Sequence, residues 1–234
     1  MTDNITFELP AEELARGITA VLPHASTEKV LPAICQVHIE LNPAAAYLTA
    51  TDKYTMGRYR IEPAEHETFP RLSVGLEVAD AKTVAKMATA RAKLGTDRKP
   101  IKFEVECGTP AIGRKITVSD GFGNSASFLA NEGAFPPVAG ILQSAAERAR
   151  NGETPAACHG YTGKYLSRFE KACDRWNPTV WAYTATMHHP VLVTLGAESP
   201  FAGVIMTVKP GEFDTPPALP HWLEHPLGDL AEVA

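Results

Sequence analysis

The sequence predicts an α+β fold in which one strand, one helix and three further strands recur as a unit. Short stretches of alternating apolar and polar residues, typical of strands, are separated by turn residues. A segment of helical periodicity follows the first strand of each group, and the whole order occurs three times, near residues 5–62, 72–131 and 156–209. Antiparallel strands with one helix per unit indicate sheets that helices cover on one face.

The first unit begins with a strand-like stretch at 5–10. A helix is expected over 11–22, with Glu12 and Glu13 in its first turn, where negative charge suits the helix dipole. Three strand-like stretches follow, over 34–41, 46–52 and 56–62.

The second and third units repeat this order. In the second, a strand over 72–79 precedes a helix over 80–94 that Asp80 is placed to cap, and strands follow over 101–107, 114–120 and 124–131. In the third, a strand over 156–162 precedes a helix over 164–176 that ends before Asn177-Pro178, and strands follow over 179–186, 190–196 and 201–208.

The units also predict the domain organisation. Residues 1–138 are expected to form one domain of two units, followed by a polar connector over 139–155 and the third unit over 156–210. Residues 211–234 are rich in proline, show no periodicity and are expected to form a tail.

The composition is that of an ordinary soluble globular protein. The 234 residues carry a net charge of −5, and no apolar run approaches the roughly 20 residues that span a bilayer. With no signal-peptide pattern at the start, a cytoplasmic location and no membrane contact are expected. The four cysteines form no C-x-x-C pair, which favours buried free thiols over disulfides or a zinc site; they are Cys35, Cys107, Cys158 and Cys173.

Basic residues form a stripe on two of the predicted helices. The second helix carries Lys82, Lys86, Arg91 and Lys93, and the third carries Lys164, Arg168, Lys171 and Arg175 beside its apolar stripe of Tyr165, Phe169, Ala172 and Trp176. The first helix has only Arg16. Exposed helix faces are often basic, but the basic stripe recurs on a second, equivalent helix of an acidic chain. This recurrence favours a continuous positive surface that binds the phosphate backbone of a nucleic acid, through contacts that recognise charge and shape and not bases.

Three other features have simpler interpretations than a catalytic or metal site. Gly121-Phe122-Gly123 precedes a strand-like stretch, so a hairpin turn is favoured over a dinucleotide loop. His188-His189 has no supporting ligand nearby, and a turn is favoured. Asp52 at a strand end is expected to accept hydrogen bonds from backbone amides rather than act as a catalytic acid. No nucleophile–base constellation, metal site or cofactor is predicted.

Three stretches resemble, in the same order, segments of the bacterial DNA sliding clamp, the DNA polymerase III beta subunit. "LTATDKYTMGRYRI" (48–61) resembles its Ala-Thr-Asp-Gly-His-Arg-Leu signature. "EGAFPPVAGIL" (132–142) resembles the Gly-x-Phe-Pro-x-Tyr segment that closes the middle domain. "SPFAGVIMTVKP" (199–210) resembles the carboxy-terminal strand. The resemblance covers residues 5 to about 210 and suggests a shortened clamp of phage or mobile-element type.

The resemblance implies a DNA-clamp-like ring with antiparallel sheets outside and helices on the inner face. A clamp is a non-enzymatic processivity factor that encircles duplex DNA without reading sequence and tethers a DNA polymerase; a clamp loader binds through a similar hydrophobic peptide. The residues expected to face DNA are Lys82, Lys86, Arg91, Lys93, Lys164, Arg168, Lys171 and Arg175. The residues expected to form the peptide pocket are Ala33, Thr51, Lys53, Tyr54, Val204, Met206, Thr207 and Val208.

The chain departs from the clamp pattern in its pocket and in its length. Residues 53–56 replace Gly-His-Arg-Leu, and Thr207 replaces a proline, so the pocket is expected to take a different peptide or to be closed. A ring of about twelve units would need about four chains of three units, so a homo-oligomer is predicted in which the third unit completes its domain across a subunit boundary. The alternatives are an interaction module that binds polymerase or another clamp without encircling DNA, and a small-molecule enzyme.

Overall fold

The computed structural model describes residues 4–64, 66–94, 100–106, 113–150, 160–183 and 189–207. The first unit has the predicted order. Strand β1 (Asn4–Pro10) leads into helix α1 (Ala11–Val21), and two single 3₁₀ turns, η1 (Leu22–His24) and η2 (Pro32–Ile34), precede β2 (Gln36–Asn42), β3 (Ala45–Thr51) and β4 (Thr55–Ile61).

The second unit also has the predicted order. It comprises β5 (Leu72–Glu77), α2 (Val78–Lys93), β6 (Pro100–Glu106), β7 (Lys115–Ser119) and β8 (Ser125–Leu129). The predicted helix start is wrong by two residues, because α2 begins at Val78 with Glu77 at the N-cap position. Asp80 therefore lies in the first turn, where its charge still suits the helix dipole, and does not cap the helix.

The rest of the chain differs more from the prediction. The predicted connector contains a helix, α3 (Ala139–Arg150). The third unit is described from Gly160 onward and consists of α4 (Gly163–Leu166), a 3₁₀ turn η3 (Phe169–Ala172), β9 (Trp181–Tyr183), β10 (Val191–Thr194) and β11 (Phe201–Ile205). Most of its predicted first strand lies outside the described residues.

The strands form two antiparallel sheets that exchange their first strands. The smaller sheet has the order β1-β6-β7-β8, so the first strand of the first unit pairs with the second unit. The larger sheet has the order β5-β2-β3-β4-β11-β10-β9, so the first strand of the second unit pairs with the first. This exchange interlocks the first two units, and we refer to the pair as the first domain. The third unit then extends the larger sheet, because β11 pairs with β4 over five residues.

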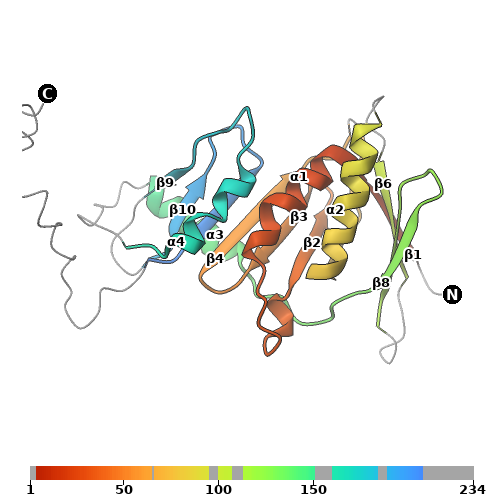
Figure 1. Ribbon diagram of the computed structural model, residues 1–234, viewed down its shortest axis with the longest axis horizontal. Coiled ribbons are helices and arrows are strands. Elements are labelled where there is room, and N and C mark those ends of the chain that lie inside the picture. The colour runs from red at the N-terminus through yellow and green to blue at the C-terminus, as the bar shows by residue number, and fades with distance from the viewer. Residues whose placement is uncertain are drawn as a thin grey trace, which may run out of the picture.

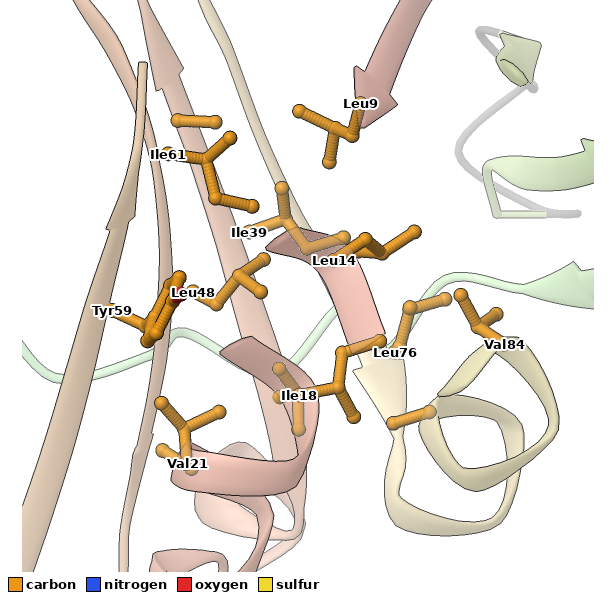
Figure 2. Packing of buried hydrophobic residues seen from close by; sticks show 14 of the residues in the cluster. Leu9, Leu14, Ile18, Val21, Ile39, Leu48, Tyr59, Ile61, Leu76 and Val84 are labelled. Carbon is orange, nitrogen blue, oxygen red and sulfur yellow. The ribbon is translucent and has the colours of Figure 1, made fainter. Parts of the chain in front are cut away.

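The larger sheet has helices on both faces. Figure 1 shows α1, α2 and α4 in front of this sheet and α3 behind it. The main core lies between the front helices and the two sheets, and Figure 2 shows Leu14 and Ile18 of α1 among Ile39, Leu48 and Leu76 of the strands. A second, smaller apolar cluster lies between α3 and the back of the sheet; its buried members are Met56, Val138, Ala145, Leu192 and Val204. We call the first side the helix face and the second the outer face.

The predicted continuous helix over 164–176 is wrong. It is broken into α4 and η3 because its side chains are held by other parts of the chain. Phe169 is buried against the ring of His24, whose centroid lies 4.8 Å away, and the Arg168 guanidinium donates to the Asp52 carboxylate at 2.6 Å. The Asp174 carboxylate accepts hydrogen bonds from the amides of Trp176 and Asn177, which closes a turn where the helix was expected to continue.

Candidate nucleic-acid interface and partner pocket

Cations on the outer faces of the sheets are paired with acids. Within the smaller sheet, Lys102 contacts Glu104 at 2.6 Å and Lys115 contacts Glu106 at 3.0 Å. On β4 of the larger sheet, Arg58 contacts Glu40 at 3.0 Å. Arg60 and Arg114 form similar pairs with Glu62 and Glu132. The positive charge of these strands is therefore largely neutralised by neighbouring side chains.

The lysines of the helix face differ, since they have no acidic partner among the described residues. Lys82, Lys86 and Lys93 are exposed on α2, and Lys171 is exposed on η3. Lys164 and Arg175 are also exposed and lie against the rings of the neighbouring Tyr165 and Trp176. These six predicted residues keep their charge available to solvent or to a ligand.

Two of these lysines line one shallow groove that crosses the helix face. The groove has a volume of about 620 Å³ and runs over α1, from Lys93 at the end of α2 to Lys171 on η3. Arg16 and Thr19 of α1 lie between them. Arg16 is bound to Glu12 at 2.7 Å and approaches Glu13 at 3.6 Å, so one cation faces two carboxylates and the middle of the groove has a net negative charge. The positive charge is concentrated on the two flanking elements.

Two predicted DNA-facing residues do not lie free on the helix face. Arg91 is only 6% exposed, and its guanidinium packs over the ring of Phe122 at 4.1 Å from the centroid. The side chain of Arg168 is 19% exposed and contacts the Asp52 carboxylate and the Thr55 hydroxyl. The geometry of both residues indicates structural roles, Arg91 beneath the β7–β8 hairpin and Arg168 between the third unit and the β3–β4 hairpin.

Most of the predicted peptide-pocket residues gather where β11 runs beside β4. The Met206 amide donates to the Tyr54 carbonyl at 2.8 Å, and Val204 lies opposite Met56 in the ladder. The Thr51 hydroxyl donates to the Thr55 carbonyl at 2.8 Å and is buried. We call this junction of β4 and β11, with the adjoining β3–β4 hairpin, the seam.

The pocket is not open in this structure. Val204 is 5% exposed, because α3 and Val138 cover it on the outer face. The ring of Tyr54 stacks on Tyr165 of α4 at 5.3 Å between centroids. Lys53 is exposed, Thr207 is half-buried, and Val208 lies outside the described residues.

The last pocket residue, Ala33, lies on η2, at the start of β2. A Cβ added to Gly133 would lie 2.8 Å from the Cα of Ala33, so the segment after β8 passes directly over Ala33.

The sequence did not reveal two residues that shape the seam. His24, on η1, is fully buried among Phe169, Phe201 and Gly57, and neither ring nitrogen has a hydrogen-bond partner. Burial, together with the nearby Arg168 charge and against the opposing effect of Asp52, lowers the pKa of His24 to about 3. Ala145 of α3 was also missed, although Val138, Leu142 and Ala145 recur at helical spacing, which is the signal that could have found it.

The remaining motifs have structural roles. Gly121 and Gly123 have positive φ angles of 72° and 98° and form the β7–β8 turn, which confirms the predicted hairpin. Asp52 accepts hydrogen bonds from the amides of Tyr54 and Thr55, as predicted. Cys35 and Cys173 are free and half-buried, whereas the other two cysteines lie outside the described residues.

In the described part of the chain, one Ser–His contact is the arrangement that most resembles a catalytic site. Ser73 and His38 form one 3.0 Å contact across β5 and β2. His38 Nδ1, however, has no hydrogen-bond partner, so no acid orients the ring as a nucleophile–base pair needs. Among the described residues, no group of three or more His, Cys, Asp or Glu residues is placed to hold a metal ion. Likewise, the described helices include none long and apolar enough to cross a membrane.

Comparison with known proteins gives matches to solved structures only. Neither the protein-family models nor the curated protein sequences match this sequence. The fold superposes on the DNA polymerase III beta subunit of Thermotoga maritima with a TM-score of 0.64 at 13% identity, over 88% of this chain and 66% of the other. It superposes on the DnaN sliding clamp of Pseudomonas aeruginosa, solved with griselimycin, with a TM-score of 0.65 at 12% identity, over 87% and 65%.

These similarities fix the fold. This chain spans about two thirds of the length of the clamps that it matches. The predicted α+β architecture, with repeated strand–helix units and antiparallel sheets, is confirmed. The helices α1, α2 and α4 of the units lie on one face as predicted, whereas α3, in the predicted connector, lies on the other face (Figure 1). The protein has the fold of the bacterial DNA polymerase III beta subunit, the sliding clamp, over about two thirds of that protein's length.

Proposed function

We propose that this protein is a non-enzymatic, clamp-like factor that holds duplex DNA against its helix face and tethers a DNA polymerase. The observation that carries the proposal is the separation of charge between the two faces. Lysines of α2 and η3 lack acidic partners among the described residues, whereas the outer strand cations are paired. Unpaired lysines can each replace a counterion of a DNA phosphate, which supports sequence-independent binding in an acidic protein.

Replacing the exposed lysines of the helix face with alanine tests this role. The test variant changes Lys82, Lys86, Lys93 and Lys171, which are exposed and unpaired. The proposal expects weaker retention of DNA and a salt dependence of binding that falls by roughly one per lost phosphate contact. Binding is measured by fluorescence anisotropy with duplex DNA over a series of salt concentrations.

A matched control removes the same charge from the outer faces. It changes Arg60, Lys102, Arg114 and Lys115 to alanine, each of which lies on a strand or next to one and is paired with a glutamate. The control should bind DNA with the affinity and salt dependence of the unmodified protein. If both variants lose affinity equally, net charge alone controls binding and the helix face has no special role.

Encircling DNA would require several copies of the chain. In the described residues, β8 ends one sheet and β9 ends the other, so each sheet has an edge that a further strand could pair with. We therefore include in the proposal a homo-oligomer, a ring of about four chains, that completes the third unit's domain across a subunit boundary. Light scattering at tens of micromolar would contradict the ring if it gave the mass of a monomer.

One observation favours a second candidate, an interaction module that never encircles DNA. The central helix α1 carries Glu12 and Glu13 around its only cation, Arg16, so the helix face is not continuously positive. Retention on DNA circles separates the two candidates. A ring is held on closed circles and lost when they are cut, whereas an interaction module shows no such difference.

The seam is the proposed docking point for the polymerase. It joins the first domain to the third unit and places Met56, Val204 and Leu192 side by side in three neighbouring strands. Large apolar side chains on the outer face of a sheet suit a short hydrophobic peptide from a partner. The same site would serve a clamp loader.

A further inference from the structure

Helix α3 covers the apolar outer face of the seam through a small contact. The helix supplies Ala145, with Leu142 and Ala146 packed against the cluster, and the segment just before the helix adds Val138 and Phe135. The sheet supplies the side chains of Met56, Leu192 and Val204. Two alanines bury little apolar area, so the helix gains little free energy from this contact. The main core, by contrast, includes several phenylalanines and many leucines and isoleucines.

The contact is also purely apolar. In the described part of the chain, no hydrogen bond or ion pair joins α3 to the sheet; the side-chain bond of Gln143 goes to Glu147 within the helix. The Arg148 Nε is buried without a hydrogen-bond partner. Polar bonds that would fix the position of the helix on the strands are therefore missing from this contact.

The sheet beneath α3 does not depend on the helix for its strand pairing. β11 is hydrogen-bonded to β4 over five residues and to β10 over four. A Cβ on Gly203 would lie 2.4 Å from the Met56 carbonyl oxygen, so the backbones of β4 and β11 approach closely at the centre of the seam. Removal of α3 would uncover an apolar face on an intact sheet.

A groove with room for a larger ligand adjoins the helix. It has a volume of about 1290 Å³, and Leu142 of α3 lines it together with Tyr47, Arg58 and Ala202 on the strands. Its lining also includes six glutamates, so the apolar contacts of a bound segment would be made at the seam, and the part in the groove would face acidic side chains. A segment that replaced α3 could extend from the seam into this groove. Such a segment would bury more apolar area than α3 does, provided that it carried large aliphatic or aromatic side chains.

We propose that α3 is a displaceable cover of the docking face, and that a partner's apolar segment with bulky side chains binds the seam by taking the place of α3. This inference rests on the proposed function, since it concerns regulation of the same docking site. The apparent affinity for a partner is then reduced by the fraction of molecules in which α3 covers the seam. A change that detaches α3 raises the affinity, and one that anchors it lowers the affinity.

Two substitutions in α3 with opposite expected effects test the proposal. Ala145→Glu places a carboxylate at a position only 3% exposed in the apolar cluster, so α3 should leave the sheet. Ala146→Leu adds apolar contact to the cluster and should hold α3 more firmly. The probe is a fluorescein-labelled peptide of residues 138–150 in which Ala145 and Ala146 are both replaced by leucine, and the readout is fluorescence anisotropy.

The expected order of affinity is Ala145→Glu, then the unmodified protein, then Ala146→Leu, with the first at least about ten-fold tighter than the second. Ser144→Glu is the matched control, because it adds the same charge at the neighbouring exposed position and should leave the affinity unchanged. Adding Val204→Glu to Ala145→Glu should abolish binding, with circular dichroism confirming that the sheet is retained. Equal affinity for all α3 variants, or no binding by any of them, would overturn the proposal.

DNA retention separates this result from a failure of the proposed function. Helix α3 lies on the outer face, on the opposite side of the larger sheet from α1 and α2 (Figure 1), so Ala145→Glu should retain DNA as the unmodified protein does. If the unmodified protein fails to retain DNA while the peptide affinities follow the expected order, the proposed DNA-binding role is wrong, but the proposal that α3 covers the docking face still holds. If DNA is retained and the peptide affinities do not change, only the cover is wrong.

Discussion

The first two units and the third unit share an order of elements but differ in how their helices are buried. Helices α1 and α2 bury one side each, and α1 alone buries six residues. In the third unit α4 buries no residue and η3 buries only Phe169. The strands of the first two units exchange partners, whereas those of the third unit add to the edge of β4. The third unit therefore depends on a core that the first domain supplies.

This difference shows what strands added to the edge of a sheet need in order to fold. A sheet edge gives β11 its backbone hydrogen bonds, but the apolar side of the added strands still requires a cover. On the helix face, Phe169 and Phe201 meet His24 of the first unit. On the outer face, α3 covers Leu192 and Val204. Two small covers therefore take the place that α1 and α2 have over the strands of the first two units.

The largest expected effect comes from removing the aromatic anchor of the third unit. Phe169→Ala should lower the free energy of opening of β10 and β11 by about 3–5 kcal/mol, because it leaves a cavity beside His24 and Phe201. Native-state hydrogen exchange measures this by strand. Protection should fall in the third unit and remain high in β1 and β6.

Phe103→Ala is the matched lesion in the first domain. Phe103 is fully buried on β6 and stacks on Phe7 at 4.8 Å between ring centroids. Its removal should lower protection in all three units, since the third unit rests on the first domain. If Phe169→Ala lowered protection in β1 and β6 as much as in β10, the third unit would be an integral part of one cooperative core.

The sequence predicted the first two units well because their signals are local. The alternation of β2 to β4 and the amphipathic pattern of α1 are properties of neighbouring residues, and packing follows them. The stretch 164–176 has an equally clear helical pattern, but contacts distant in the chain decide its structure. Arg168 donates a hydrogen bond to Asp52, and Phe169 packs against His24. Neither contact can be predicted from local periodicity.

The candidate site was predictable to a similar extent. The exposed lysines of α2 follow from helical spacing alone, and the structure leaves them free on one face. Arg91 has the same spacing but packs under Phe122, since the β7–β8 hairpin reaches over the end of α2. The cover over Val204 depends on α3, whose alanine-rich face gave only a weak apolar signal.

The next largest effect is a loss of stability at low pH, because the first two units and the third unit meet at a buried neutral histidine, His24. The pKa of His24 is about 3 in the folded protein, below the 6.5 of a free histidine, so only the unfolded state binds a proton between these values. Stability should therefore fall as the pH drops from about 6.5 toward 3, by up to about 1.4 kcal/mol per pH unit. Asp52 and Arg168 are the charged groups that influence this histidine.

His24→Leu should reduce this acid sensitivity. Leucine cannot take up a proton, and it removes two buried nitrogens that lack hydrogen-bond partners, so stability at neutral pH should change little. His189→Leu, on the exposed surface of the third unit, is the control. Urea unfolding at a series of pH values compares the variants, and an unchanged slope in His24→Leu would show that other groups cause the loss.

A smaller effect is expected from the ion pair between the regions. Arg168→Ala should cost about 1–3 kcal/mol, because it removes a charge-assisted bond from Asp52, which still accepts bonds from two backbone amides. Lys171→Ala, three residues along on the exposed surface, should leave stability unchanged and reduce DNA retention. Thermal unfolding and DNA anisotropy together distinguish the two. The assignment of Arg168 to structure is wrong if its removal lowers only DNA affinity.

The smallest effect distinguishes the β3–β4 turn from the β7–β8 turn. The β7–β8 turn has glycine at its positive-φ positions, whereas the β3–β4 turn at the seam has Lys53, with a φ of 79°. A side chain costs about 1–2 kcal/mol in this left-handed conformation, and glycine loses about 0.5–1 kcal/mol of chain entropy on folding. Lys53→Gly should therefore stabilise the protein by less than about 1 kcal/mol. Lys53→Ala removes the charge but keeps the Cβ, so an equal rise in the urea midpoint for both variants would assign the gain to charge and not to backbone strain.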